Sequence, residues 1–340
     1  MKALTKPGER EMIAGIRRAA GRGGKGVLLG IGDDCAILRV PRGHELLVTT
    51  DLSLEGRHFR RDWHPARAVG HRTLARGLSD LAAMGARPLA SFLSLAVPGE
   101  LAGSAWCDEF MAGFLALAKR AGVTLAGGDT AESPKLYGAK RGSVIADIVL
   151  TGTAPAGTAM RRSGARVGDY LYVTGALGGA AAELQRAGRV LAARAGVSRG
   201  DEKMANQGLH PHLYPQPRLA VGEALRRRGI AAACIDVSDG LSTDLAHLCA
   251  ESKCGGVVEA AAIPIHGLAA GRADALELAL HGGEDYELLF TARPGVRVPR
   301  SIGGVKITRI GTMTTGRGMK LVKDGKTVKL EAKGWEHFVR

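Results

Sequence analysis

The sequence has no long apolar run and few cysteines, and both absences exclude classes of protein. None of its hydrophobic stretches approaches the ~20 residues that a membrane-spanning helix needs. Residues 1–20 form a charged amphipathic stretch without the apolar core of a signal peptide. The five cysteines are scattered and contain no C-x-x-C pair, which argues against a disulfide framework and a structural zinc site. We therefore expect a cytoplasmic protein with free thiols and no membrane partner.

Aromatic residues are also scarce, at 4% of the chain, whereas hydrophobic residues make up 45% and glycine occurs 49 times. This composition is typical of a compact α/β protein with many tight turns. The formal net charge of +14 raises the possibility of nucleic-acid binding. The basic residues are spread along the chain, however, and no aromatic residues that could stack bases are interleaved with them. We expect no nucleic-acid partner, since an anionic small substrate explains the charge as well.

The familiar ATP-binding motifs are absent. Residues 21–26 fit G-x-G-x-x-G, but they follow a predicted helix and precede a predicted strand, the reverse of the order that binds a pyrophosphate. Gly325-Lys326-Thr327 resembles the end of a Walker A loop but lacks its first glycine, and Asp324-Gly325 predicts a type I′ hairpin turn instead. The H-R-D and D-F-G segments of protein kinases are missing. Any phosphoryl transfer must therefore use another architecture.

The length and the alternation of patterns predict two mixed α/β domains. The 340 residues exceed one average domain of ~150 residues. Helical and strand-like periodicities alternate, with a helix expected over 64–84, ended by Gly85, and a short strand over 124–126. The stretch 154–169 contains Pro155, three glycines and the basic pair Arg161-Arg162, a composition that suits an interdomain connection. We therefore expect one domain over residues 1–155 and a second over 156–340.

Aspartates beside Gly, Ser or Thr recur at five places where a strand is expected to end or a helix to begin. Helix capping and tight turns explain any one of them. Four of the five follow apolar strand-like runs, so the carboxylates could gather at one sheet edge, where cations must neutralise them. Because His and Cys are missing from the pattern, Mg²⁺ is favoured over zinc, with phosphate oxygens and water as its other ligands. The five segments are 30–34, 49–51, 78–80, 127–130 and 236–240.

Longer motifs resemble the thiamine-monophosphate kinase family. They occur in the family's order and span nearly the whole chain. In the first half they are G-I-G-D-D-C-A from Gly30, T-T-D-L-x-x-E-G-x-H-F from Thr49, L-S-D-L-A-A-M-G from Leu78 and G-G-D-T from Gly127. In the second half they are R-R-S-G-A from Arg161, D-V-S-D-G-L-x-x-D-L from Asp236, G-G-E-D-Y-E-L from Gly282 and K-G-W-E-H-F from Lys333.

The resemblance implies the architecture of the aminoimidazole ribonucleotide synthetase superfamily. Its members pair an N-terminal α/β domain, through which they form homodimers, with a C-terminal α/β domain that completes the nucleotide and thiamine-phosphate site. They bind ATP without a Walker loop, in agreement with the missing motifs. The implied reaction is Mg²⁺-dependent transfer of the ATP γ-phosphoryl group to thiamine monophosphate, giving thiamine diphosphate and ADP. The acceptor is already an anion and needs no strong base, so we name no catalytic base.

The resemblance also implies roles for individual residues. The implied ligands of several Mg²⁺ ions are Asp34, Thr49, Thr50, Asp51, Asp80, Asp129, Asp236 and Asp239, with Asp33 a weaker candidate. The implied ATP contacts are Gly128, Arg162 and Ser238. The implied thiamine-phosphate contacts are His58, Glu284 and Trp335. A carboxylate and an aromatic face both suit a ligand that carries a cationic thiazolium ring.

One segment departs from the family pattern, and one alternative function stays open. Asp129-Thr-Ala-Glu132-Ser-Pro replaces the usual Asp-Thr-Thr-Arg, so any phosphate contact of that arginine must be lost or supplied by Lys135, Lys140 or Arg141. The alternative is another ATP-dependent synthetase of the same superfamily, which would share Mg–ATP binding but use a different acceptor.

Overall fold

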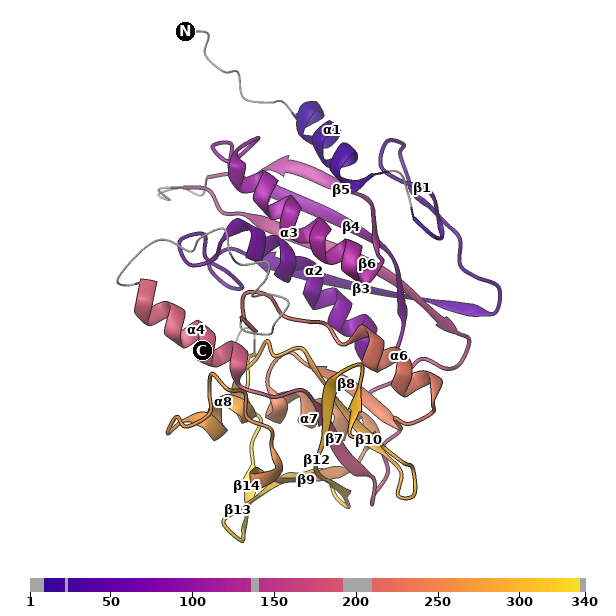
Figure 1. Ribbon diagram of the computed structural model, residues 1–340, viewed down its shortest axis with the longest axis vertical. Coiled ribbons are helices and arrows are strands. Elements are labelled where there is room, and N and C mark those ends of the chain that lie inside the picture. Colours follow the sequence, from indigo (N-terminus) through magenta and orange to yellow (C-terminus); the bar gives the residue numbers. More distant parts are fainter. Residues whose placement is uncertain (1–8, 22–23, 136–140, 192–209, 337–340) are drawn as a thin grey trace. The chain divides into compact units, whose positions relative to one another are not determined.

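The computed structural model describes residues 9–21, 24–135, 141–191 and 210–336 (Figure 1). These residues form two compact units. Of the described residues, unit 1 contains 9–78 and 88–156, and unit 2 contains 79–87, 157–191 and 210–336. Residues 79–87 therefore pack with the second half of the chain. The domain boundary expected at 155/156 had assigned them to the first domain. No helix in these residues is long and apolar enough to cross a bilayer.

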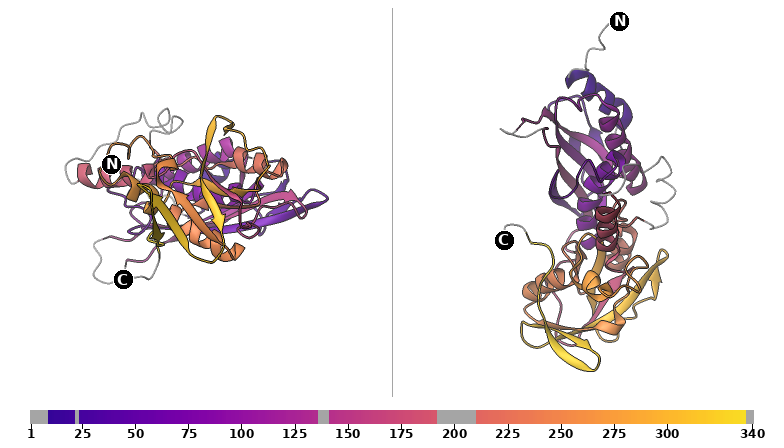
Figure 2. Two further views of the ribbon diagram at one scale, coloured as in Figure 1. Left: turned by 90° about the horizontal axis from the view of Figure 1, so that it is seen from below. Right: turned by 90° about the vertical axis from the view of Figure 1, so that its left-hand side faces the viewer.

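Unit 1 is built on a four-stranded sheet with the order β3-β6-β4-β5. Strands β3 and β6 run antiparallel, whereas β4 and β5 run parallel. Helices α2 and α3 lie against one face of the sheet, as the right-hand view of Figure 2 shows. These elements are β3 (His44–Leu54), β4 (Arg87–Val97), β5 (Thr124–Glu132), β6 (Ile145–Pro155), α2 (Ala66–Ala83) and α3 (Ala105–Ala121). Helix α1 (Glu9–Ala20) and a two-stranded ribbon, β1 (Val27–Leu29) with β2 (Ile37–Leu38), complete the unit.

Glycines allow α2 and α3 to approach closely. A Cβ atom on Gly70 would lie 1.9 Å from the Phe110 carbonyl oxygen, and one on Gly113 would lie 1.9 Å from that of Arg67. The helix expected over 64–84 is confirmed as α2, and the chain turns after it at Gly85, whose φ is +67°. The strand expected over 124–126 was predicted too short. Because β5 pairs with β4 through residue 132, the G-G-D-T motif lies within the strand and not after it.

Unit 2 contains an eight-stranded sheet with the order β14-β13-β9-β12-β7-β10-β8, and β11 pairs with β12 outside this path. Most neighbours are antiparallel, and β13 with β9 is a parallel pair. The strands are β7 (Tyr170–Thr174), β8 (Ala233–Val237), β9 (Gly255–Glu259), β10 (Glu287–Ala292), β11 (Ser301–Ile302), β12 (Val305–Thr314), β13 (Met319–Lys323) and β14 (Lys326–Leu330). The helices are α4 (Gly179–Leu191), α6 (Leu219–Arg227), α7 (Leu241–Ser252), α8 (Ala275–His281) and the 3-10 turn η1 (Ala260–Ala262).

Strand β8, which begins the D-V-S-D-G motif, lies in the core of unit 2. All five residues of β8 are buried, and Ile235 and Val237 pack in one cluster with Leu241 and Leu245 of α7. The loop at 238–240 therefore follows directly from a fully buried strand. At the far edge of the sheet, the turn between β13 and β14 has positive φ at Asp324 (+52°) and Gly325 (+72°). The predicted type I′ hairpin is confirmed.

Candidate functional site

Unit 1 contains a cavity of about 580 Å³ beside β5. Its walls come from α1, from residues 30–36 and from the middle of β4 and β5. Three residues that the sequence predicted for ATP or metal binding, Asp34, Gly128 and Asp129, line it together. Ile13 and Phe92 are among the apolar residues on its other walls. The cavity can therefore offer both an apolar surface and carboxylate oxygens to one ligand.

Gly128 is required by the backbone at this cavity. It pairs with Leu93 of β4 and has a φ of +148°, and a Cβ atom there would lie 1.9 Å from the Leu93 carbonyl oxygen. Any larger residue would push β5 away from β4. The following carboxylate, Asp129, is exposed and accepts a hydrogen bond from the Thr130 N–H at 2.8 Å. Gly128 thus allows β5 to pair closely with β4 next to Asp129, which borders the cavity.

The Thr-Thr-Asp motif lies in the middle of β3 and divides between the two faces of the sheet. Asp51 faces α2, where its carboxylate lies 3.3 Å from the Arg76 guanidinium. Thr49 points the same way, toward Gly77 of α2. Thr50 is exposed on the opposite face, because successive strand residues alternate. The side chains of Thr49 and Asp51 could bind one ion, whereas Thr50 could join them only through its backbone.

Two motifs far apart in the sequence meet in unit 2. Asp236 is 3% exposed at the end of β8, and its Oδ2 accepts a hydrogen bond from the Ser79 hydroxyl at 2.7 Å. Ser79 precedes the predicted metal ligand Asp80 on α2. The contact therefore joins the L-S-D motif to the D-V-S-D-G motif. Sequence reasoning passed over Ser79, although its place inside the L-S-D motif was the available signal.

Asp244 shapes the loop at 238–240 and was also passed over. Its Oδ2 accepts hydrogen bonds from the N–H groups of Ser238 and Asp239, each at 3.0 Å. Burial, followed by the nearby charges of Asp236 and Asp239, raises the pKa of Asp244 to about 8. Three carboxyl groups are thus concentrated at this loop, and neutralising them requires protons or cations. The x-x-Asp spacing at the end of the motif was the signal for Asp244.

The candidate acceptor residues Glu284 and Trp335 lie at the same loop. The Glu284 N–H donates to the Ser238 carbonyl at 2.7 Å, and the Trp335 N–H donates to the Asp239 carbonyl at 2.9 Å. Trp335 is about half exposed, at 48%. The structure therefore brings together four residues that the sequence assigned to ATP, metal and thiamine phosphate, namely Ser238, Asp239, Glu284 and Trp335.

The Glu284 backbone is strained and firmly anchored. Glu284 and Tyr286 have positive φ angles of +68° and +50°, a conformation that costs about 1–3 kcal/mol for each non-glycine residue. Between them, the buried carboxylate of Asp285 accepts hydrogen bonds from the N–H groups of Gly178 at 2.6 Å and Ala180 at 3.1 Å, at the start of α4. Burial raises the pKa of Asp285 to about 7. Such strain at an anchored loop is typical of a binding site.

The remaining candidates lie apart from this loop in the sequence. Arg162 in unit 2 is exposed, and its carbonyl oxygen accepts a hydrogen bond from the Ser252 hydroxyl at 2.9 Å. His58 in unit 1 belongs to the turn after β3, where its Nδ1 accepts a hydrogen bond from the Leu54 N–H at 3.0 Å. This bond places the proton of a neutral His58 ring on Nε2.

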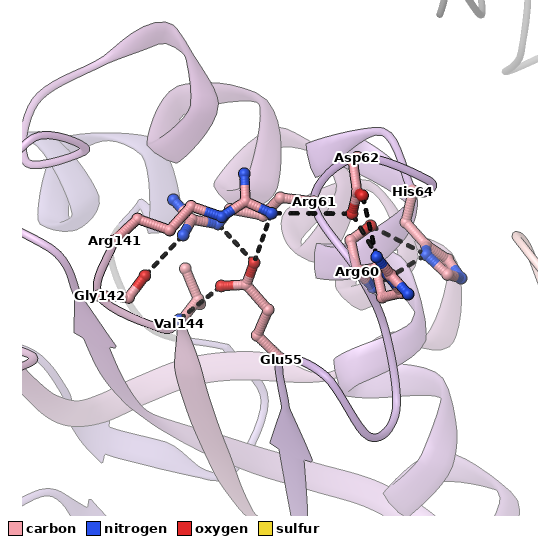
Figure 3. A network of polar contacts seen from close by, with 8 residues as sticks. All are labelled: Glu55, Arg60, Arg61, Asp62, His64, Arg141, Gly142 and Val144. Atoms are coloured by element: carbon pink, nitrogen blue, oxygen red, sulfur yellow. Dashed lines mark hydrogen bonds and ion pairs between the residues drawn. The ribbon is translucent and has the colours of Figure 1, made fainter. Parts of the chain in front are cut away.

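A network of polar side chains holds the segment that follows β3, from Glu55 to His64 (Figure 3). We call it the Glu55 network. The Glu55 carboxylate lies 2.8 Å from the Arg61 guanidinium, and both side chains are nearly buried, at 9% and 8% exposure. Glu55 also accepts a hydrogen bond from the Val144 N–H at 2.9 Å, and Arg61 donates to the Gly142 carbonyl at 2.6 Å. Arg141, one of the three cations named for the divergent segment, lies 3.9 Å from Glu55.

The predicted metal ligands do not form a ready-made cage. Within the described ranges, no group of three or more His, Cys, Asp or Glu side chains is arranged to hold an ion. The candidates instead stand in smaller sets, with Asp34 and Asp129 at the cavity of unit 1 and Asp236 and Asp239 at the loop of unit 2. Their donors are all oxygens. Since Mg²⁺ takes one or two protein carboxylates and fills its shell with water and phosphate oxygens, the residues fit this ion.

Two family models match most of the chain. The model for the N-terminal domain of AIR synthase related proteins matches residues 32–154, and the model for their C-terminal domain matches residues 166–324. These matches define the class, a two-domain AIR synthase related protein, and confirm the expected architecture.

Comparison with individual relatives shows to which family within this class the chain belongs. The chain is 40% identical over 317 residues to thiamine-monophosphate kinase of Salmonella typhimurium, which covers 91% of each sequence. The crystal structure of thiamine-monophosphate kinase from Stenotrophomonas maltophilia is 35% identical, with a TM-score of 0.77 and coverage of 95% of this chain and 99% of that one. A structure of AaThiL complexed with AMPPCP and TMP is 28% identical, with a TM-score of 0.72 over 99% and 100% of the two chains. The chain belongs to the thiamine-monophosphate kinase family and is an ATP-dependent phosphotransferase.

Proposed function

We propose that this chain transfers the γ-phosphoryl group of ATP to thiamine monophosphate in a Mg²⁺-dependent reaction that yields thiamine diphosphate and ADP. The observation that carries the proposal is the convergence of Ser238, Asp239, Glu284 and Trp335 at one loop of unit 2. The first two residues are candidates for nucleotide and metal, and the last two for the acceptor. Relatives named as thiamine-monophosphate kinases, and one of them in complex with AMPPCP and TMP, support the same reaction.

The cavity of unit 1 is our candidate for part of the nucleotide site. Its apolar wall, with Ile13 and Phe92, suits a purine base, and the carboxylates of Asp34 and Asp129 suit metal-bound phosphates. Because Gly128 has no side chain, a phosphate can approach its backbone closely. Arg162 is our candidate for a further contact to phosphate oxygens, because its planar guanidinium can donate two parallel hydrogen bonds.

Magnesium is part of the proposal. When bound, Mg²⁺ would neutralise the charges of two anionic reactants and order the transferred phosphoryl group. The residues that would hold it are the carboxylates at the cavity of unit 1, those at the loop of unit 2, Asp80, and Asp51 with Thr49 and Thr50 on β3. The acceptor phosphate is ionised and attacks without deprotonation, so the protein has to position the reactants and needs no base.

The acceptor is proposed to contact Glu284, Trp335 and His58. Thiamine monophosphate carries a fixed positive charge on its thiazolium ring. Trp335, which is about half exposed, supplies an aromatic ring suited to a cation–π contact, and the Glu284 carboxylate supplies the opposite charge. When the His58 ring is neutral its proton is on Nε2, because Nδ1 accepts a hydrogen bond from the Leu54 N–H.

We further propose that the enzyme works as a homodimer in the cytoplasm, where ATP is available. The sheet face that bears Thr50 exposes Leu46, Val48 and Leu52 at 46%, 58% and 50%. An apolar row of this kind along one strand is typical of a surface that another protein covers. The same face of a second copy is our candidate for that cover, because isologous contacts are the commonest in soluble oligomers.

An acceptor panel tests the proposed reaction. Purified protein with ATP and Mg²⁺ is offered thiamine monophosphate, thiamine or no acceptor, and ADP and thiamine diphosphate are measured by chromatography. We expect thiamine diphosphate and ADP in equal amounts with thiamine monophosphate alone, and none when EDTA is present. ADP release that requires a different acceptor would favour a related synthetase. Indifference to ATP together with salt-sensitive binding to DNA would favour a nucleic-acid-binding protein.

A further inference from the structure

A buried histidine contacts the carboxylate that is our candidate for acceptor binding. The Nδ1 atom of His212 lies 3.1 Å from Oε2 of Glu284. The His212 side chain is only 2% exposed, whereas that of Glu284 is 24% exposed. His212 is therefore too deep to meet a substrate itself, but it touches the inner side of a group that reaches the surface.

The backbone of His212 is in turn hydrogen-bonded to a carboxylate on α4. Glu183 is 8% exposed, and its Oε2 accepts a hydrogen bond from the His212 N–H at 2.7 Å. Its other oxygen lies 2.6 Å from Nδ1 of His210. One buried carboxylate thus fixes the backbone at His212 and the ring of the neighbouring histidine. The imidazole of His212 projects toward Glu284 from a rigid support.

The Glu284 side chain benefits from such support because its backbone geometry is unusual. The positive φ at Glu284 is maintained by its N–H bond to Ser238 and by the Asp285 anchor. These bonds fix where the Cβ atom lies, but a glutamate has three further rotatable bonds. A contact at the carboxylate end restricts those bonds before any ligand arrives, which lowers the entropy cost of binding.

We propose that His212 is a positioning residue that orients the Glu284 carboxylate toward the cationic acceptor. The inference rests on the proposed function, in which Glu284 binds thiamine monophosphate. The expected consequence is specific to one substrate. Removing the His212 contact raises KM for thiamine monophosphate about tenfold, as expected when a close contact that orients a charged group is lost, and leaves KM for ATP within about twofold.

Two substitutions at His212 separate positioning from packing. His212→Phe retains the buried ring volume but has no ring nitrogen to contact the Glu284 carboxylate, so we expect the tenfold increase in KM for thiamine monophosphate. His212→Asn places an amide nitrogen close to the position of Nδ1 and should restore most of the affinity. His247→Ala, on the exposed side of α7, is the matched control and should change neither KM. An equal rise in both KM values, or no rescue by asparagine, would overturn the proposal.

A double-mutant cycle distinguishes this proposal from the proposed function. Glu284→Gln alone should raise KM for thiamine monophosphate, and adding His212→Phe should then raise it little further. If Glu284→Gln leaves this KM unchanged, the proposed role of Glu284 fails. If Glu284→Gln raises KM but His212→Phe does not, only the positioning role fails. Should His212→Phe not fold, Glu183→Gln gives the second measurement, with a smaller rise in the same KM expected and an unchanged KM contradicting the proposal.

Discussion

His58 and Glu284, the two polar candidates for acceptor binding, are supported in different ways by the two units. The turn of His58 is tied down at its flanks by the Glu55 network, in which two nearly buried side chains form an ion pair. Glu284 is held at the residue itself, by its own N–H, by the adjacent Asp285 and by His212. Substitutions behind His58 should therefore act mainly on folding, whereas substitutions behind Glu284 should act mainly on substrate affinity.

The largest expected effect is on turnover. A substitution on β3 tests whether unit 1 takes part in catalysis as well as in folding. Asp51→Asn preserves volume but removes a carboxylate proposed to hold Mg²⁺. We expect turnover to fall about a thousandfold, similar to the loss of a key electrostatic group. The free energy of unfolding should change by no more than about 1 kcal/mol, since the Asp51–Arg76 pair is partly exposed. Steady-state kinetics and denaturant unfolding measure the two quantities.

The matched control for Asp51 is Asp108→Asn, which removes an exposed carboxylate from α3. Its turnover should equal that of the unmodified chain. Unchanged phosphorylation by folded Asp51→Asn would remove β3 from the metal site.

The next largest effect is on stability and tests whether the Glu55 network stabilises the fold. Arg61→Met leaves the nearly buried Glu55 carboxylate without its closest cation, and we expect a loss of about 3 kcal/mol in the free energy of unfolding. The double variant Glu55→Leu/Arg61→Met should recover part of that loss, because no buried charge is left uncompensated. Urea unfolding gives both values.

An exposed ion pair in the same turn supplies the control. Arg60→Met removes a partner of Asp62 in a pair whose side chains are 51% and 46% exposed, so stability should change by less than about 1 kcal/mol. Equal losses in Arg60→Met and Arg61→Met would show that burial of the Glu55 pair does not matter.

The smallest effect concerns the Asp285 anchor beneath Glu284. Its pKa in the folded chain, about 7, lies above the ordinary value of 3.8, so the folded state binds this proton more tightly than the unfolded state. The resulting stabilisation is fully present below the ordinary pKa and is lost as the pH rises through about 7. Between pH 5 and pH 8 we expect about 2 kcal/mol of stability to disappear. In Asp285→Asn this part of the pH dependence should be absent, and parallel stability–pH curves for the two proteins would contradict it.

Much of the fold followed from patterns that are local in the sequence. The helical period and Gly85 predicted α2, and Asp324-Gly325 predicted the hairpin turn, because a few neighbouring residues decide these structures. The length of β5 was missed, since its glycines and Asp129 disfavour a strand and only pairing with β4 extends it.

The candidate site was predictable only in part. Motifs identified Glu284 and Trp335, and the structure placed both at the loop of Ser238. The supporting residues Glu183 and His212 carried no signal of their own, and the L-S-D motif that contains Ser79 did not reveal its partner. Ser79 and Asp236 are 157 positions apart, and no periodicity or spacing reports such a contact. Supporting residues of this kind become visible only once the chain is folded.

Labelled phosphate shows directly whether the γ-phosphoryl group of ATP reaches thiamine monophosphate. Protein is incubated with Mg²⁺, thiamine monophosphate and ATP labelled with ³²P at the γ-phosphoryl group. We expect the label to appear in thiamine diphosphate, in an amount equal to the ADP formed. We also expect Glu284→Gln to lose this transfer at low acceptor concentration and to recover it at high concentration. Label released only as inorganic phosphate, with no labelled thiamine diphosphate, would contradict the proposed reaction.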